Sequence, residues 1–209
     1  ANILHLSYCH EIAKVFGPVN IITLSKNFKH IVEDDPLVKN VIFLDKYHKK
    51  ITDINNLAKI FKQYSFSNFF IFYPSVRFFF AAKFAGIQNI FTYPLLKKKN
   101  LHLVHAAKKF TEKSLNIVNC PTETRLFISD SKKRMANDLK KSGKKNIIIG
   151  AGSSGPTTKW GASKYIELVK KINRNNDCFF YILGGPEEKK TIDEIVNSVG
   201  DQHAESLVN

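Results

Sequence analysis

The chain has 209 residues, 44% hydrophobic and 12% aromatic, which suffices for a buried core in one large or two small domains. Its formal net charge is +14, but 28 of its 32 basic residues are Lys, which argues against nucleic acid as a partner because such sites favour Arg. Three scattered cysteines exclude a disulfide framework or zinc motif, and with no signal peptide or spanning-length apolar run we expect a cytoplasmic protein.

Short apolar runs alternate with amphipathic stretches from end to end, a pattern typical of βαβ units and a parallel sheet. The periodicity predicts helices at residues 2–16, 26–33, 53–64, 76–85, 102–113, 131–142, 163–173 and 186–199. It predicts strands at residues 19–25, 40–45, 68–73, 89–93, 124–129, 146–150 and 178–185. The expected fold class is α/β, with two Rossmann-like, doubly wound parallel-sheet domains.

The charged stretch "KKSGKK" (140–145) is the predicted linker, which gives domains at residues 1–140 and 141–209. Read as one helix, residues 2–16 place Leu4, Tyr8, Ile12 and Val15 on one face, so we expect the first strand of the N-terminal domain to be missing. Only two βα units follow the linker, so we expect the C-terminal domain to be incomplete.

The stretch "NIIIGAGSSGPTTKW" (146–160) carries Gly150, Gly152 and Gly155 in the G-x-G-x-x-G spacing of dinucleotide sites. The rest of that fingerprint is lacking, because the next strand ends in Gly184-Gly185 rather than in a carboxylate for the ribose. An NAD-dependent oxidoreductase therefore remains only as a weak alternative. The Walker spacing fails too, since no Gly-Lys-Ser/Thr closes the loop.

The same loop still suits phosphate. Ser153, Ser154 and Thr158 offer hydroxyl donors, Lys159 offers one cation, and the backbone N–H groups lie near a helix N-terminus. The equal alternative is a loop whose glycines merely permit tight turns. A second glycine-rich loop, "LGGPEEKK" (183–190), follows the next strand, and both loops should lie at one carboxyl edge, where open α/β sheets bind ligands.

The segments "GAGSSGPTTKWGASKYIELVKKI" and "FFYILGGPEE" together resemble the signature of the ADP-heptose:lipopolysaccharide heptosyltransferases, glycosyltransferase family nine. In that family a Gly/Ala-Ser/Thr loop precedes Lys-Arg-Trp and a helix, and a Gly-Gly-x-x-Glu loop follows the next strand. The segments "DDPLVKNVIF" and "YPSVRFFFAAKFAGIQNIFTYP" are similar to its earlier motifs, so the resemblance covers nearly the whole chain.

This resemblance implies a GT-B fold, with an N-terminal acceptor domain and a C-terminal donor domain. It also implies inverting, metal-independent transfer of a sugar, heptose in the family, from an ADP-sugar to the lipopolysaccharide core, with no cofactor besides the donor substrate. In such a reaction a carboxylate base deprotonates the acceptor hydroxyl as the ADP leaves.

Matched to the family's motifs, Ser153 and Ser154 correspond to its hydroxyl pair at the phosphates, and Thr158 and Lys159 to its paired basic positions. Glu188 corresponds to the acidic residue at the nucleoside, so the predicted donor-binding residues are Gly152, Ser153, Ser154, Thr158, Lys159, Gly184, Gly185 and Glu188. Asn2 stands where the family has its aspartate base, and because an amide cannot act as a base, no catalytic residue is assigned.

On the acceptor side, Arg77 follows a strand and either binds an anionic acceptor group or is an ordinary surface residue. His102 and His105, three residues apart on a predicted helix, are expected to be surface residues, and the alternative is that they contact an acidic acceptor. The Lys-rich segments predict solvated faces or a surface for anionic lipid at the inner membrane, and they stand at residues 46–50, 95–100, 105–110 and 131–145. The remaining alternative is a non-catalytic nucleotide-sugar or glycolipid-binding protein, or an inactive fragment of such an enzyme.

Overall fold

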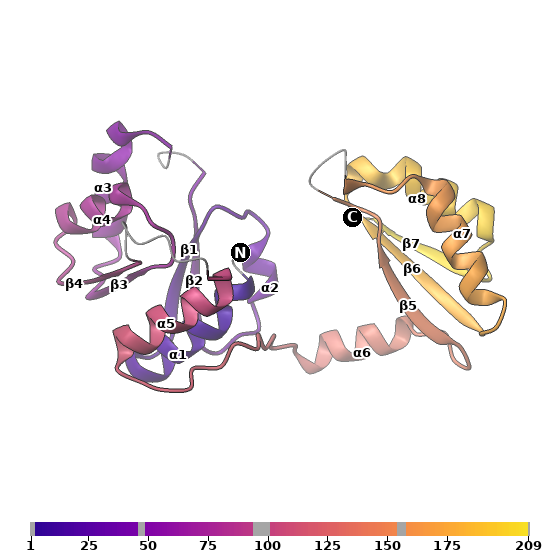
Figure 1. The fold of residues 1–209 in the computed structure, drawn as a ribbon, viewed down its shortest axis with the longest axis horizontal. Coiled ribbons are helices and arrows are strands. Elements are labelled where there is room, and N and C mark those ends of the chain that lie inside the picture. The colour runs from indigo at the N-terminus through magenta and orange to yellow at the C-terminus, as the bar shows by residue number, and fades with distance from the viewer. Residues whose placement is uncertain (1–2, 46–48, 94–100, 154–157, 209) are drawn as a thin grey trace. The chain divides into compact units, whose positions relative to one another are not determined.

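The computed structural model describes residues 3–45, 49–93, 101–153 and 158–208. The chain forms two compact units, residues 1–129 and 130–209 (Figure 1). The boundary predicted from the sequence lies at residue 140 instead. The difference is helix α6 (Asp130–Leu139), which buries none of its residues and groups with the second unit.

The first unit alternates helices with strands. Its elements are η1 (Ile3–His5), α1 (Leu6–Phe16), β1 (Val19–Thr23), α2 (Phe28–Ile31), β2 (Val38–Phe43), η2 (Ile51–Asp53), α3 (Ile54–Gln63), β3 (Asn68–Ile71), α4 (Val76–Phe84), β4 (Asn89–Thr92) and α5 (Leu103–Leu115). Strand β1 pairs with β2, and β3 with β4, both in parallel. These elements lie within a few residues of the predicted ones.

Helix α1 is buried on more than one side. Tyr8 packs in a cluster with Phe110 of α5, whereas Leu6 packs in another with Phe28. Leu4 and Val15 are 43% and 53% exposed, so the predicted single apolar face was wrong at both ends. The reason is that α1 contacts β1 as well as α5, which lies alongside it (Figure 1).

Aromatic rings fill much of the first unit's interior. Phe61 of α3 is fully buried and contacts Phe69 with ring centroids 4.9 Å apart. Phe70 and Phe91, on the paired strands β3 and β4, stack at 4.4 Å. Such ring pairs add to the free energy gained from burying their apolar area.

The second unit is a three-stranded parallel sheet in the order β5-β6-β7. Its elements after α6 are β5 (Lys145–Gly150), α7 (Ala162–Asn173), β6 (Cys178–Gly184), η4 (Pro186–Glu188), α8 (Lys189–Val199) and β7 (Ala204–Val208). Helices α7 and α8 cover one face of the sheet (Figure 1), where Phe180 and Ile182 of the central strand pack against Ile192 and Ile195. Strand β7 was not predicted, so the unit has one strand more than expected.

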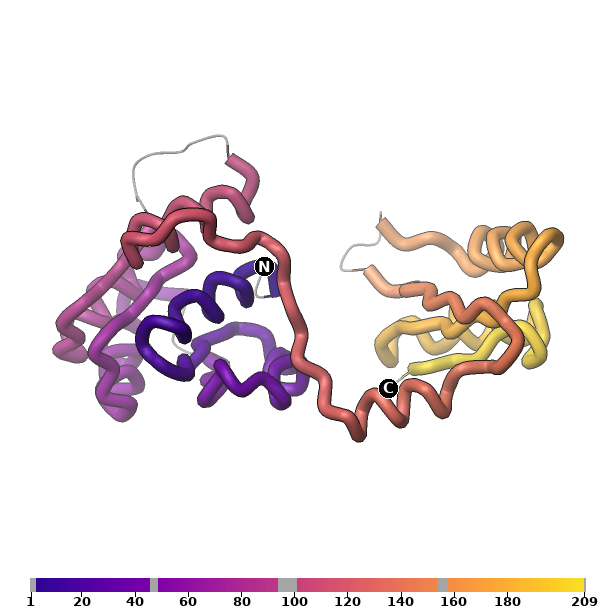
Figure 2. Tube along the Cα trace, turned by 90° about the horizontal axis from the view of Figure 1, so that it is seen from below, coloured from indigo at the N-terminus to yellow at the C-terminus, as the bar shows by residue number. Residues whose placement is uncertain are grey.

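The predicted strand at residues 124–129 was wrong, because this segment is extended but pairs with no strand among the residues that the structure describes. It runs beside the start of α1 (Figure 2), where the Thr124 hydroxyl donates to the Ile3 carbonyl oxygen at 3.0 Å. Farther along, the Ser129 N–H donates to Asp34 Oδ2 at 3.0 Å. Side-chain and main-chain contacts of this kind hold the segment in place of a sheet ladder.

Within the described part of the chain, no helix combines the length and the apolarity that a membrane span requires.

Candidate functional site

The two glycine-rich loops leave the second sheet at neighbouring points. Gly150 at the end of β5 lies in register with Leu183 of β6, and the Ala151 N–H donates to the Leu183 carbonyl oxygen at 2.8 Å. The loops after β5 and β6 therefore share one carboxyl edge, as the sequence predicted. Ligands of open α/β sheets bind at this edge.

An ion pair joins the two loops. Lys159 Nζ lies 2.6 Å from Glu188 Oε1, although 29 residues separate them in the sequence. The other carboxylate oxygen, Glu188 Oε2, accepts the Gly185 N–H at 2.9 Å. One carboxylate thus fixes the turn of its own loop and binds the cation of the other loop.

The hydrogen bond between the two side chains shifts both protonation equilibria. It lowers the pKa of Glu188, with a further contribution from the Gly185 N–H, and it raises the pKa of Lys159. Both shifts favour the charged forms. The pair is therefore a carboxylate and an ammonium group throughout the neutral pH range.

Glu188 packs closely against glycines of both loops. A Cβ atom built on Gly184 would lie 2.9 Å from Glu188 Cβ and 2.6 Å from Ile192 Cδ1. One built on Gly152 would lie 3.3 Å from Glu188 Oε2. Glycine at positions 152 and 184 allows Glu188 to approach both loops this closely. The alternative interpretation, in which the glycines only permit tight turns, does not explain this approach.

The first loop holds further polar and aromatic groups. The hydroxyls of Ser153 and Thr158 form a short hydrogen bond with one another, and Lys159 follows directly. Trp160 is 49% exposed, and its ring lies 5.5 Å from that of Tyr165 on α7. Trp160 is therefore not part of the buried core. Tyr165 was not among the predicted site residues, and its only signal in the sequence is its place in the first helical turn after the loop.

The described part of the chain contains all the predicted donor residues except Ser154, which lies outside it together with Asn2. The structure brings the loop residues Gly152 and Lys159 together with Glu188. Among the described residues, no three His, Cys, Asp or Glu side chains gather where they could hold a metal ion.

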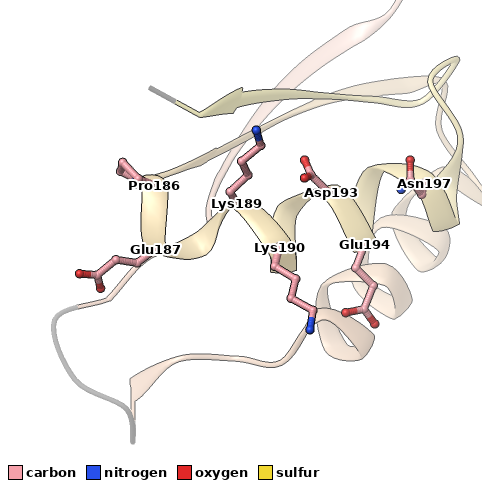
Figure 3. Close-up of a pocket in the computed structure, with 7 residues that line it drawn as sticks. All are labelled: Pro186, Glu187, Lys189, Lys190, Asp193, Glu194 and Asn197. Carbon is pink, nitrogen blue, oxygen red and sulfur yellow. The ribbon is translucent and has the colours of Figure 1, made fainter.

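A shallow depression along η4 and α8 lies beside the site but has a different character. Seven residues line it, and they are Pro186, Glu187, Lys189, Lys190, Asp193, Glu194 and Asn197 (Figure 3). Both acidic and basic side chains line it, as on an ordinary exposed helix face. It includes neither Lys159 nor Glu188, so we assign it no ligand.

The predicted acceptor-side residues belong to the first unit. Arg77, in the first turn of α4, uses its Nη1 group to donate a short hydrogen bond to the Lys49 carbonyl oxygen. His102 caps α5 by accepting the Val104 N–H at 3.4 Å, and His105 is exposed nearby. These contacts give both histidines the surface positions that were expected.

The family model of glycosyltransferase family 9 (heptosyltransferase) matches residues 75–206, which include Arg77 and all the predicted donor residues. The chain belongs to glycosyltransferase family 9. The family 9 chain is thus a glycosyltransferase with the predicted GT-B type of α/β fold. No match was found among curated protein sequences.

Solved structures support the fold. The family 9 chain is similar to the ADP-heptose LPS heptosyltransferase II of Escherichia coli, with a TM-score of 0.70 and 15% identity over 99% of this chain and 68% of that one. A family 9 glycosyl transferase from Veillonella parvula gives 0.70 and 14%, over 99% and 66%. The E. coli heptosyltransferase WaaC with ADP gives 0.64 and 12%, over 99% and 71%. The chain therefore spans about two thirds of the length of these proteins.

Proposed function

We propose that this family 9 chain transfers a heptose from an ADP-sugar to the lipopolysaccharide core, with inversion and without a metal ion or other cofactor. The observation that carries the proposal is the Lys159–Glu188 pair, which joins two glycine-rich loops at the carboxyl edge of a parallel sheet. That edge combines a cation, hydroxyl groups and a carboxylate. These are the groups that a nucleoside diphosphate requires.

The donor would bind with its diphosphate along the first loop. Lys159 has three N–H donors and uses one of them on Glu188, which leaves others for phosphate oxygens. The hydroxyls of Ser153, Ser154 and Thr158 would supply further donors. Glu188 accepts through both oxygens in this structure, and its remaining lone pairs would accept from ribose hydroxyls.

In the transfer step, the acceptor hydroxyl oxygen forms a bond to the anomeric carbon while the bond from that carbon to the phosphate oxygen breaks. The hydroxyl proton passes to a base that no residue described here is assigned to supply. Negative charge develops on the departing ADP, and Lys159 would stabilise it most strongly at that stage. The predicted contribution of Lys159 is therefore to the rate as well as to binding.

A second candidate is a protein of the same fold that binds a nucleotide-sugar or glycolipid without turnover. The observation that favours it is Asn2, which stands where the family has its base. Transfer of radiolabelled sugar from an ADP-sugar to lipopolysaccharide core distinguishes the two. Donor binding without transfer would identify the non-catalytic protein.

The acceptor side of the proposal is the first unit, with anionic lipid of the inner membrane and phosphorylated core sugars as partners, at the cytoplasmic face. This unit has 18 basic and 8 acidic residues. Attraction to such partners weakens as ionic strength rises. Membrane binding that did not respond to salt would contradict this part of the proposal.

Calorimetric titration of ADP and of an ADP-sugar tests the donor site. We expect Lys159→Ala to weaken binding by about tenfold to a hundredfold, because charge-assisted hydrogen bonds contribute roughly 1.5–3 kcal/mol. Lys170→Ala, on the exposed side of α7, is the matched control. Unchanged affinity in Lys159→Ala would contradict the proposed site, and heat from NAD rather than ADP would favour the oxidoreductase.

Glu188→Gln separates two roles of the carboxylate. If Glu188 accepts from the ribose, the amide binds ADP more weakly than the wild type does. If Glu188 instead only competes with phosphate for Lys159, the Glu188→Gln side chain no longer pairs with the Lys159 ammonium group. ADP then binds more tightly than it does to the wild type. Glu187→Gln, one residue earlier in η4, is the control.

A further inference from the structure

Helix α4 exposes a stripe of large apolar side chains. Val76, Phe80 and Phe84 are spaced four residues apart, so they share one face, and they are 51%, 43% and 65% exposed. The rings of Phe80 and Phe84 lie 6.2 Å apart. Single exposed apolar residues are ordinary on protein surfaces, but a contiguous apolar stripe that includes two neighbouring rings marks an interaction surface.

The face of α4 that carries this stripe is not the face that packs against the rest of the first unit. Ala81 and Ala82 are fully buried in a cluster with Phe61 of α3, beside which α4 lies (Figure 1). The helix is therefore apolar on two faces. Folding of the first unit accounts for only one of them.

Cations lie on the same helix as this stripe and on elements next to it. Arg77 and Lys83 belong to α4 itself, and Lys83, which directly precedes Phe84 in the sequence, is exposed. The hydrogen bond from Arg77 to the Lys49 carbonyl oxygen places the Lys49-Lys50 segment beside the first turn of the helix. Lys59 and Lys62 are exposed on the neighbouring helix α3.

The surrounding sequence has almost no negative charge. Residues 46–111 contain twelve Lys and Arg residues but a single acidic residue, Asp53. The Asp53 carboxylate accepts the backbone N–H groups of Lys49 and Lys50, at 3.2 and 2.8 Å. Within the described ranges, no ion pair joins Arg77, Lys83 or these lysines to a carboxylate.

We propose that this α4 face, defined as Val76, Phe80 and Phe84 with Arg77 and Lys83, docks on an anionic lipid bilayer. The aromatic side chains enter the headgroup region and the cations contact lipid phosphates, as on interfacial helices with apolar and basic side chains. A soluble anion would leave the Phe rings in water, and a second copy of the chain would bring two cationic faces together. The inference depends on the proposed function only in taking the membrane as the partner, and it does not involve the donor site.

Binding to lipid vesicles tests the proposal on the full chain, without donor or lipopolysaccharide. We expect the wild type to bind vesicles that contain phosphatidylglycerol and to bind pure phosphatidylcholine much more weakly. The double variant Phe80→Ser/Phe84→Ser should bind anionic vesicles about a hundredfold more weakly, since two large apolar side chains no longer enter the bilayer. Lys83→Glu should lose about tenfold or more at low salt.

Matched controls lie in the second unit. Met135 and Ile148 are each 67% exposed, and Lys171 is an exposed cation on α7. Met135→Ser/Ile148→Ser and Lys171→Glu should keep wild-type vesicle binding. All variants should keep wild-type ADP affinity, so that failure of membrane docking and failure of the donor site are told apart.

A fluorescent reporter tests insertion without removing the stripe. The chain has one Trp, Trp160, so Trp160→Phe/Phe84→Trp carries a single indole on the α4 face. Its emission should shift to the blue on anionic vesicles and be quenched by brominated lipid, whereas Trp160→Phe/Ile148→Trp should show neither change. Three outcomes would overturn the proposal: no quenching at position 84, wild-type vesicle binding by the double Ser variant, or a wild-type dimer that the double Ser variant abolishes.

Discussion

The two compact units differ in both their cores and their charges. The first buries aromatic residues such as Tyr8, Phe61 and Phe110 around short paired strands, whereas the second buries mainly aliphatic residues between β6 and the helices α7 and α8. The first has 18 basic and 8 acidic residues, and the second has 14 and 10. The positive charge of the chain is thus concentrated in one unit.

This difference indicates how the two surfaces are specialised. In the second unit acidic and basic side chains mix, and the pair at the loops, Lys159 and Glu188, stands out by its geometry rather than by its charge. In the first unit the cations lack acidic neighbours over a long stretch, and an aromatic stripe lies among them. This contrast agrees with the two proposals, a small, specific ligand on the second unit and an extended anionic surface for the first.

The largest predicted effect tests whether the two units are stabilised separately. Phe61→Ala should lower the free energy of unfolding of the first unit by about 3–5 kcal/mol, because it removes a fully buried ring and leaves a cavity. Far-UV circular dichroism in urea should show this loss. The fluorescence transition of Trp160, which reports on the second unit, should stay where it is.

Ile182→Ala in β6 is the reciprocal control, since its side chain is fully buried in the second unit. This variant should lower the urea concentration at which the Trp160 fluorescence changes. The part of the circular dichroism transition that comes from the first unit should stay unchanged. If both variants shifted both probes equally, the two units would unfold as one and the comparison between them would fail.

The next effect concerns a buried polar pair of the first unit. His10 Nε2 lies 2.6 Å from Asp35 Oδ2, with the two residues 7% and 4% exposed. Asp35→Ala should cost about 3 kcal/mol, since it leaves the imidazole without its buried partner. In a double-mutant cycle with His10→Ala, the second change should cost much less than it does alone. Additive losses would contradict a direct interaction.

A smaller effect is expected at the second unit's glycine loop. Gly184→Ala places a methyl group 2.6 Å from Ile192 Cδ1 and 2.9 Å from Glu188 Cβ, so both side chains or the local backbone must move. We expect a loss of about 1–3 kcal/mol in the free energy of unfolding, as for other overpacked sites. ADP should also bind more weakly, because Glu188 is displaced. Gly161→Ala, whose new methyl group would meet only Ser163 Oγ at 4.0 Å, should change neither quantity much.

The sequence predicted the fold best where apolar runs were long and unambiguous. Strand β6 and helix α7 were recognised within about a residue, but β7 was missed because Glu205 and Ser206 interrupt a short stretch. Residues 124–129 look like a strand in isolation. They are not one, because a strand requires a neighbouring edge, and local periodicity contains no information about it.

The candidate site could be predicted in outline only. Alternating elements imply that consecutive glycine-rich loops share a sheet edge, and the structure has them there. The contact between Lys159 and Glu188 could not be predicted, since it depends on the register of β5 against β6 and on the absence of side chains at Gly152 and Gly184. The burial of α1 on two sides could not be predicted either, because it depends on which other elements pack against the helix.

The smallest predicted effect is a pH dependence that belongs to the first unit. His5 stacks on Phe72 with centroids 5.1 Å apart, and its Nε2 atom is buried without a hydrogen-bond partner among the described residues. Burial lowers the pKa of His5 below its ordinary value of 6.5. As pH falls below that value, the unfolded chain binds the proton first, so the first unit should lose stability towards the lower folded pKa.

His5→Phe should reduce this loss, because a ring of similar shape has no proton to bind. Urea unfolding between pH 8 and pH 5, followed by circular dichroism, should show a flatter dependence of the free energy of unfolding on pH in this variant. The exposed control His105→Gln should keep the wild-type slope. A slope that His5→Phe left unchanged would mean that His5 takes up its proton equally well in the folded unit, and that the aromatic cluster of the first unit admits water to its imidazole.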